Sequence, residues 1–475
     1  MVMEHSLKFK KTKIVATIGP ATENLKSMTA LAKAGMDVVR LNFSHGDHNE
    51  HLKRIELARK VSDKLGRPIA VLQDLSGPKI RIGEFYKERI MLKKGSTFTL
   101  TTKKIVGDET RVFVNYKNLP KEVKRGTIIL LDDGKKKLEV KSTHKDFIRC
   151  KVLVGGETKG RRGVNVPGAY LKISAITEKD KKDLIFGARH SVDFVALSFV
   201  RKANDVHALR LLLEKQKSDA HIIAKIETSE AIDNIDSIIE AADGIMVARG
   251  DLAIEVPAHD VPLLQKMIIH KCNTVGKPVI TATQMLESMI KSPVPTRAEV
   301  SDVANSILDG TDAVMLSEET TLGEYPVHAV TVMSQVARRT ETISHKKHLE
   351  EGRGIKGIVD AVSYSVVHVA DEVDAKAIIA LTESGFTPRM ISRFKPSQPI
   401  IVMTPNRRTL AKVTLSFGVL PVAIHGFRYV GEVMSIVSAF VKKRGIAKRG
   451  DKVVIAAGVP FGRSGATNML LVHVV

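Results

Sequence analysis

Five side chains of the kinds used in metal and phosphate chemistry stand at the ends of short apolar runs. They are Arg40, Lys225, Glu227, Asp251 and Thr283. Taken singly, each has an ordinary explanation, because a lone Lys or Arg in such a place is most often a surface charge and a lone Asp is often a helix N-cap. Their recurrence at the same kind of position in separate runs favours one shared site.

The residue types indicate the chemistry of such a site. The two carboxylates, Glu227 and Asp251, suit a hard divalent cation, Mg²⁺ or Mn²⁺, which keeps open positions for substrate oxygens. The cations of Arg40 and Lys225 suit a phosphate or a carboxylate. Phosphoryl transfer asks a protein for positioning and charge stabilisation, so the set predicts a phosphotransferase.

The apolar runs themselves predict the elements that position these residues. They read as buried parallel strands, with helical segments between most of them. All but one of the spacings between successive run ends are 24 to 34 residues, which predicts an α/β fold of the (β/α)₈ barrel type with its functional groups at the C-terminal ends of the strands. The runs are Ile14 to Ile18, Val38 to Asn42, Ile69 to Asp74, Phe194 to Ser198, Ile222 to Glu227, Ile245 to Asp251, Val279 to Thr283 and Ala313 to Ser317.

The exceptional spacing, of 124 residues after the third run, predicts an inserted small all-β domain that acts as a lid over the mouth of the barrel. Its expected strands are Thr97 to Thr102, Thr127 to Leu131, Lys137 to Ser142 and Phe147 to Val154, with glycines between them. We expect the barrel in residues 1–74 and 168–342 and the insertion in 75–167.

The C-terminal part, residues 343–475, predicts a second α/β domain with an open, mostly parallel sheet. A helical pattern over Val359 to Ala370 precedes expected strands at Ala377 to Leu381, Ile400 to Met403 and Val453 to Ala457. The joint with the barrel is expected within Thr340 to Lys356.

Composition limits the possible partners. Only Cys150 and Cys272 are present and no apolar run has the roughly 18 residues of a membrane helix, so we expect a cytoplasmic protein without a membrane partner. The net charge of +22 raises the local concentration of anions, but the basic residues are dispersed, so the charge alone does not identify a partner. Aromatic residues are 4% with no Trp, and no recognition motif is present, so we do not expect a nucleic-acid partner.

Several longer motifs resemble those of the pyruvate kinases, in order and over essentially the whole chain. They are Lys13 to Pro20, Met36 to Gly46, Gly163 to Gly168, Lys225 to Glu227, Ala248 to Leu252, Thr281 to Leu286, Pro295 to Glu299 and Met315 to Ser317. The resemblance implies the reaction of phosphoenolpyruvate, ADP and a proton to give pyruvate and ATP.

The resemblance also implies roles for the residues at the strand ends. Glu227 and Asp251 would hold the divalent ion, and Lys225 would neutralise charge on the phosphoryl group in flight while Arg40 grips it. Gly250, Asp251 and Thr283 would line the carboxylate and enolate end of the substrate. Thr283 would belong to a relay, through water, that protonates the enolate.

Four further residues would contact the nucleotide by the same resemblance: Asn42, His45, Arg81 and Arg162. Arg162 stands where the family often has Lys, which keeps the charge but changes the geometry.

A departure from the family pattern bears on K⁺. Members that need K⁺ bind it near the positions of Asn42, Ser44, Asp74 and Leu75, and carry Glu at the position of Lys79. Members that do not need K⁺ carry Lys there. We therefore expect an enzyme that does not require K⁺, with the Lys79 ammonium as the internal substitute for that cation.

The C-terminal domain has a candidate effector site. Its residues are Thr382, Ser384, Gly385 and Thr387, in a loop between a strand and a helix, with Pro460 to Gly465 expected to close over it. The resemblance implies an allosteric effector such as AMP or a sugar monophosphate, and a homotetramer.

Two other functions remain open from the sequence. A metal-dependent lyase or aldolase acting on pyruvate enolate explains Glu227 and Asp251, but it gives no role to Asn42, Ser44 and His45 or to the lid. A basic nucleic-acid-binding protein explains the charge of +22 but leaves the strand-end residues without a role.

Overall fold

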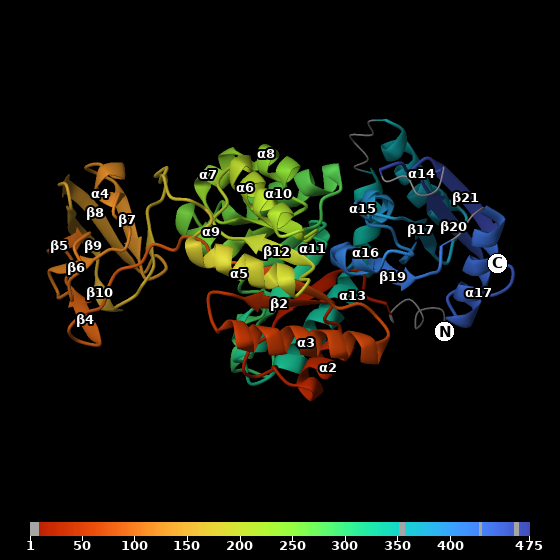
Figure 1. Ribbon diagram of the computed structural model, residues 1–475, viewed down its shortest axis with the longest axis horizontal. Helices are drawn as coiled ribbons and strands as arrows, with labels where there is room; N and C mark the ends of the chain where they lie inside the picture. Colours follow the sequence, from red (N-terminus) through yellow and green to blue (C-terminus); the bar gives the residue numbers. More distant parts are fainter. Residues whose placement is uncertain (1–8, 351–356, 427–429, 460–464) are drawn as a thin grey trace.

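A computed structural model describes residues 9–350, 357–426, 430–459 and 465–475. The chain forms three bodies in a row, with the barrel in the middle, the inserted β-sheets at one end and the C-terminal sheet at the other (Figure 1). We call residues 75–167 the lid and residues 357–475 the C-terminal region. Within the described residues, no helix is long and apolar enough to cross a membrane.

The central body is a closed barrel of eight parallel strands, as the spacing of the apolar runs predicts. The order around the barrel is β1, β16, β15, β14, β13, β12, β3 and β2, with the last strand beside the first. The strands are β1 (Lys13–Thr17), β2 (Val38–Asn42), β3 (Ala70–Asp74), β12 (Phe194–Leu197), β13 (His221–Ile226), β14 (Gly244–Ala248), β15 (Val279–Ala282) and β16 (Ala313–Leu316).

Helices surround this barrel and connect its strands. They are α2 (Leu25–Ala34), α3 (His48–Leu65), α5 (Glu178–Arg189), α6 (Ala203–Lys215), α7 (Ser229–Asp233), α8 (Ile235–Ala241), α9 (Arg249–Glu255), α10 (Val261–Val275), α11 (Arg297–Leu308), α12 (Glu318–Thr321) and α13 (Pro326–Glu350), with the 3₁₀ turn η1 (Glu287–Ile290). Several begin at a side-chain cap, such as Asp47 for α3, and α3 and α10 end at a left-handed glycine.

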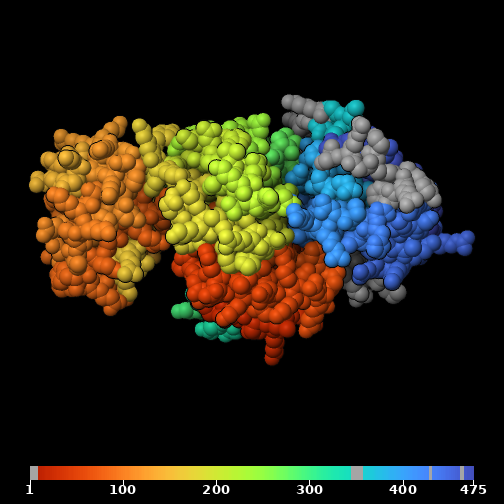
Figure 2. Space-filling view, in the orientation of Figure 1, coloured from red at the N-terminus to blue at the C-terminus, as the bar shows by residue number. Residues whose placement is uncertain are grey.

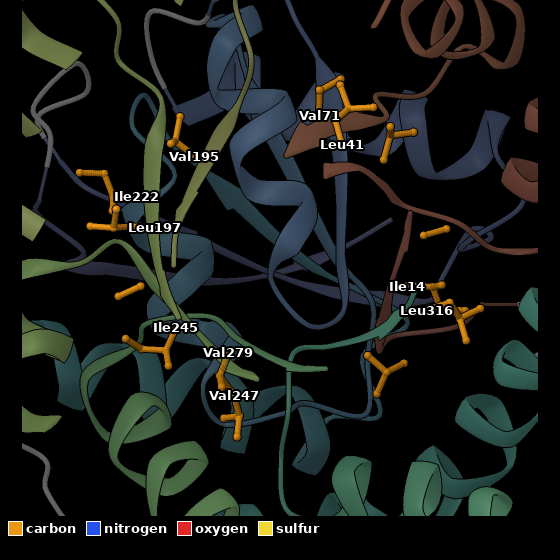
Figure 3. Packing of buried hydrophobic residues seen from close by; sticks show 14 of the residues in the cluster. Ile14, Leu41, Val71, Val195, Leu197, Ile222, Ile245, Val247, Val279 and Leu316 are labelled. Atoms are coloured by element: carbon orange, nitrogen blue, oxygen red, sulfur yellow. The ribbon is translucent and has the colours of Figure 1, made fainter. Parts of the chain in front are cut away.

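Alternate residues of each strand pack into two separate cores. Outward-facing residues such as Ile14, Leu41 and Val247 pack against the helices, and Figure 3 shows this layer at close range. Inward-facing residues such as Val15 and Met246 fill the barrel interior, and Leu415 of the C-terminal region belongs to this same interior cluster. Both faces of each strand are thus buried, which is why the runs are apolar throughout.

The lid is all-β apart from one helical turn, and it has its own hydrophobic core. One sheet has the order β11, β7, β8, β9, β5, β6, and a second pairs β10 with β4. Its elements are β4 (Arg89–Leu92), β5 (Thr97–Thr101), β6 (Arg111–Phe113), α4 (Leu119–Glu122), β7 (Ile128–Leu131), β8 (Lys136–Thr143), β9 (Phe147–Val154), β10 (Gly156–Lys159) and β11 (Val164–Asn165). Figure 2 shows the surface hollowed where the lid meets the barrel.

The C-terminal region has a five-stranded sheet in the order β19, β18, β17, β20, β21, parallel except for β21. Its elements are α14 (Ile358–Glu372), β17 (Ile378–Leu381), α15 (Phe386–Ser392), β18 (Ile400–Thr404), α16 (Arg407–Lys412), η2 (Val413–Leu415), β19 (Val419–Ala423), α17 (Val430–Lys443), β20 (Lys452–Ala457) and β21 (Met469–Val474).

Three expectations from the sequence need correction. The run Ile245 to Asp251 is not all strand, because β14 ends at Ala248 and α9 begins at Arg249. The expected joint at Thr340 to Lys356 is largely helical, because α13 continues to Glu350. The short strands β4, β6, β10, β11, β19 and β21 were not expected, since their burial depends on partners far away in the sequence.

A buried ion pair joins the barrel to the C-terminal region. Lys395 donates through Nζ to Oδ1 of Asp312, at 2.8 Å, and both side chains are almost fully buried. The same carboxylate accepts the backbone N–H of Phe417 at 3.0 Å and that of Val279 at 3.0 Å. Burial lowers the pKa of Lys395, while the attraction of Asp312 opposes that shift. Asp312 thus binds two barrel strands and the C-terminal region together.

Replacing Lys395 with Met should destabilise the protein by about 3–5 kcal/mol, because it leaves the Asp312 carboxylate buried without its cation. The matched control is Lys376→Met, which breaks an exposed pair with Asp374 and should cost about 0–1 kcal/mol. Thermal and denaturant midpoints measure both. Equal shifts in the two variants would contradict a special role for the Asp312 pair.

Candidate functional site at the barrel rim

The predicted functional side chains lie at the C-terminal ends of the barrel strands, which we call the rim. The lid leaves the barrel after β3 and returns before α5, so it connects at the same end (Figure 1). Because eight parallel strands all end at this rim, residues far apart in the sequence come within contact distance.

The centre of the site is the Asp74 carboxylate, which bridges two cations. Oδ2 of Asp74 lies 2.7 Å from Nε of Arg40, and Oδ1 lies 3.2 Å from Nζ of Lys225. Arg40 also donates to Oγ1 of Thr17 on β1, at 2.9 Å. Asp74 is 1% exposed and Arg40 8%, so these charges face each other almost without solvent.

Lys225 has two further partners. Its ammonium donates to Oγ of Ser198 at 2.6 Å and lies 3.0 Å from Oε1 of Glu227. The other oxygen of Glu227 accepts the backbone N–H of Phe199 at 2.7 Å, which fixes that carboxylate at the end of β13. The Lys225 cation therefore lies between two carboxylates and a hydroxyl from three different strand ends.

The electrostatics of this cluster follow from burial and pairing. For Lys225, burial works against the charged form, but Asp74 and Glu227 outweigh it and raise the pKa. For Asp74, burial works to raise the pKa, but the positive charges of Lys225 and Arg40 outweigh it and lower the pKa. For Glu227, burial dominates and raises the pKa; Lys225 opposes the rise, and repulsion from Asp251 adds to it.

The two predicted metal ligands follow adjacent barrel strands, β13 and β14. Asp251 lies in the first turn of α9, and its charge is close enough to Glu227 to affect that residue's pKa. No group of three or more His, Cys, Asp or Glu gathers as a metal site anywhere in the part of the chain that the structure describes. Two mutually repelling carboxylates fit a Mg²⁺ site that leaves most positions to water and substrate oxygens.

Thr283 and Gly250 face each other across two strand ends. The Gly250 N–H donates to Oγ1 of Thr283 at 2.8 Å, and that hydroxyl donates to the Ala282 carbonyl at 2.6 Å. Thr283 has φ of +70°, a left-handed conformation that is rare for a β-branched residue. Arg249 holds it there by donating to the Thr283 carbonyl at 2.7 Å and pairing with Asp302 at 2.7 Å.

The predicted nucleotide contacts lie on two separate segments. Asn42 and His45 belong to the loop after β2, where Asn42 Oδ1 accepts the Ser44 N–H at 3.1 Å and His45 is exposed. Arg81 and Arg162 lie on the two adjacent chain segments at the base of the lid. The Arg81 guanidinium donates to the carbonyl of Arg161 at 3.1 Å. Nε of Arg162 lies 3.3 Å from Oδ1 of Asp132.

Some of the groups predicted to surround a monovalent cation already have partners within the protein. The Leu75 side chain is buried, and its carbonyl accepts Oγ of Ser198 at 2.7 Å. Lys79 has its ion pair with Asp251, at 3.7 Å between Nζ and Oδ1. The Lys79 ammonium therefore lies beside a predicted metal ligand, and among the described residues its ion pair is with Asp251 rather than Asp74.

The candidate effector loop is ordered by its own hydroxyls. The Gly385 N–H donates to Oγ1 of Thr382 at 2.9 Å, and Gly385 has φ of +83°. Thr387 is buried and its hydroxyl is 2.9 Å from that of Thr467, so it faces the interior of the C-terminal region. Ser384 is half-buried. Residues 460–464 of the expected closing loop lie outside the described residues.

Sequence reasoning missed several residues of the site. Ser198, Thr17 and Arg249 contact predicted site residues directly. Ser198 stands at a strand end like the others and could have been found by that rule, but a lone Ser there is usually a cap. The backbone N–H of Phe199 leaves no signal in the sequence.

The chain is similar to known proteins over nearly its whole length. Residues 9–330 match the family model for the pyruvate kinase barrel domain, and residues 360–473 match that for the pyruvate kinase alpha/beta domain. The chain is 47% identical over 471 residues to a pyruvate kinase of Clostridium acetobutylicum, covering 98% of this chain and 100% of that protein. It is 48% identical over 472 residues to one of Geobacillus stearothermophilus, covering 98% of this chain and 80% of that protein.

A solved structure agrees with these relatives. The crystal structure of a pyruvate kinase from Cryptosporidium parvum superposes with a TM-score of 0.95 at 38% sequence identity. The match covers 99% of this chain and 97% of that one.

Replacing Asp74 with Asn should destabilise the protein by about 3–5 kcal/mol at pH 7, because two buried cations lose their shared carboxylate. The folded pKa of Asp74 lies below the unfolded value of about 3.9, so its stabilisation is present above that pH and is lost as the pH falls through the folded pKa. The difference in denaturant midpoint between the wild type and the variant should therefore shrink below about pH 4.

The control for this measurement is Asp374→Asn, at an exposed carboxylate paired with Lys376. It should change the midpoint little at any pH. A gap between the wild type and Asp74→Asn that stays constant from pH 7 to pH 3 would mean that the Asp74 charge is not the stabilising feature.

Proposed function

Because the chain belongs to the pyruvate kinase family, we propose that it performs the family's phosphotransferase reaction with the rim residues just described. The reaction converts phosphoenolpyruvate and ADP to pyruvate and ATP. Family membership decides against the lyase or aldolase alternative. It also accounts for the lid and the C-terminal region, which the nucleic-acid-binding alternative leaves without a role. The observation that carries the assignment of residues is the buried cluster around Asp74 and Lys225.

Arg40 and Lys225 bind the phosphoryl group of phosphoenolpyruvate. Asp74 supports both roles, because it orients the two cations by hydrogen bonds while its charge keeps Lys225 protonated. A compact ammonium held rigidly beside the transferring group stabilises charge there without reorganisation. Ser198 and Thr17 complete the positioning of Lys225 and Arg40.

Glu227 and Asp251 hold a divalent ion, Mg²⁺ or Mn²⁺. When bound, the ion supplies Lewis-acid stabilisation of phosphate and carboxylate oxygens and neutralises the repulsion between the two carboxylates. Each carboxylate also has a lysine partner within the protein. Asp251 pairs with Lys79, and Glu227 pairs with Lys225.

Gly250, Asp251 and Thr283 line the carboxylate and enolate end of the substrate. The Thr283 hydroxyl, in its left-handed backbone conformation, lies at the mouth of the barrel beside the Gly250 amide. A hydroxyl is a weak acid, so Thr283 acts as one member of a relay, through water, that protonates the enolate. Asn42, His45, Arg81 and Arg162 contact ADP from the barrel loop and from the base of the lid.

We further propose an allosteric site at Thr382, Ser384 and Gly385 for AMP or a sugar monophosphate, with Thr387 as a buried support rather than a direct contact. ATP formation at subsaturating phosphoenolpyruvate, with and without each compound, tests this.

We also propose that the protein is a homotetramer, which light scattering tests, and that it is located in the cytoplasm. The location is supported by the two buried free cysteines.

The first experiment measures ATP formation from phosphoenolpyruvate and ADP with Mg²⁺. The wild type should be active, and Lys225→Met should lose about 10²–10³-fold in kcat because a positioned charge is removed. Phosphoenolpyruvate binding to the variant, followed by calorimetry, should persist. The exposed Lys215→Met is the matched control and should keep full activity. No ATP from the wild type would refute the proposal.

The requirement for K⁺ is tested in the same assay. We propose that the Lys79 ammonium supplies the positive charge that K⁺ provides in other members, so the wild type should be active in K⁺-free buffer. Lys79→Glu should lose at least about 100-fold without K⁺, and added K⁺ should restore part of it. Lys94→Glu makes the same charge change at an exposed site on the lid and serves as the control. High activity of Lys79→Glu without K⁺ would disprove this role.

A further inference from the structure

A buried histidine, His51, supports the loop after β2. It lies on α3 and is 1% exposed. Its ring stacks on Phe43, with centroids 3.9 Å apart and planes inclined by 13°. Its Nε2 is 2.9 Å from the carbonyl oxygen of His45, in the loop to which the nucleotide contacts of Asn42 and His45 are assigned.

The protonation of His51 follows from its two ring nitrogens. A carbonyl oxygen can only accept, so Nε2 must carry the hydrogen and donate it to His45. Nδ1 is buried and has no hydrogen-bond partner, which suits the unprotonated nitrogen of a neutral ring. Burial lowers the pKa of His51 to about 4; nearby Arg54 and Lys179 lower it as well, against the His45 hydrogen bond and Asp183. His51 is therefore a neutral donor of fixed tautomer at neutral pH.

The rest of the loop is held from other directions. The Phe43 carbonyl accepts Nζ of Lys179 at 2.6 Å and Oγ of Ser76 at 3.0 Å. These bonds fix the buried start of the loop, whereas residues 44–47 are exposed. Among the described residues, His51 is the side chain that donates to the His45 carbonyl.

We propose that His51 is a positioning residue for ADP: its stacked, neutral ring holds the His45 carbonyl and so sets the conformation of the nucleotide-binding loop. The inference rests on the proposed role of Asn42 and His45 in binding the nucleotide. It adds a specific consequence, since the hydrogen bond acts on the loop after β2 and not on the Arg40 and Lys225 cluster that binds phosphoenolpyruvate.

Two substitutions separate the hydrogen bond from the stacking. His51→Phe keeps an aromatic ring against Phe43 but removes the donor. His51→Gln removes the ring but keeps an N–H donor the same number of bonds from the backbone. His51→Phe should raise KM for ADP about 3- to 10-fold, the loss expected for one neutral hydrogen bond, with KM for phosphoenolpyruvate changed less than about twofold. His51→Gln should recover most of the affinity for ADP.

The matched control is His368→Phe, at an exposed histidine stacked on Tyr364 in the C-terminal region, which should leave both KM values unchanged. Thermal midpoints of all variants show whether each is folded. If both KM values rise together in His51→Phe, or if neither moves, the positioning role is wrong. If the wild type makes no ATP, the proposed function has failed instead.

A spectroscopic measurement tests the same inference without activity. In protein labelled with ¹⁵N-histidine, His51 should show one protonated nitrogen, Nε2, and one unprotonated nitrogen, Nδ1, from pH 8 to about pH 5. This signature should vanish in His51→Phe. A His51 signal that titrates near the ordinary value of about 6.5 would overturn the inference.

Discussion

The arrangement of the rim depends on one carboxylate that is shared by two buried cations. Without Asp74, Arg40 and Lys225 would repel each other in a nearly dry environment, where charge interactions are strong. With it, three charged side chains from strands β2, β3 and β13 lock into one geometry. The cost of burying them is tolerable only because each is hydrogen-bonded as well as paired. Asp74 and Glu227 together balance the charges of Arg40 and Lys225, so both cations are held charged at the rim.

The outer residues of the site are held less tightly than the centre. Lys79 and Asp251 are each about one-third exposed, and their separation of 3.7 Å is that of a loose pair. Thr283 is held differently: the Arg249 side chain donates to its backbone carbonyl, and its backbone has a left-handed conformation. A rigid centre and a looser edge are what a site needs if it must orient one substrate and still admit a second one together with a metal ion.

Sequence reasoning recovered the barrel because its strands are buried on both faces and so leave continuous apolar runs. It recovered Arg40, Lys225 and Glu227 as neighbours because parallel strands end at one rim. It overextended the run from Ile245 to Asp251, because the polar residues at the strand end, Arg249 to Asp251, form the first turn of α9 rather than the last residues of β14. It could not foresee that Thr387 faces inward or that Lys79 pairs with Asp251, because side-chain direction in loops depends on contacts distant in sequence.

The interior of the barrel has a further consequence for the molecule as a whole. Family models divide the chain into a barrel part and an alpha/beta part. The packing crosses that division, because Ala411 and Leu415 complete the barrel's inner core and Lys395 neutralises Asp312, the residue just before β16. The C-terminal region therefore completes the interior of the barrel. A chain cut between the two parts would expose apolar residues at this end of the barrel and leave the Asp312 carboxylate without its cation.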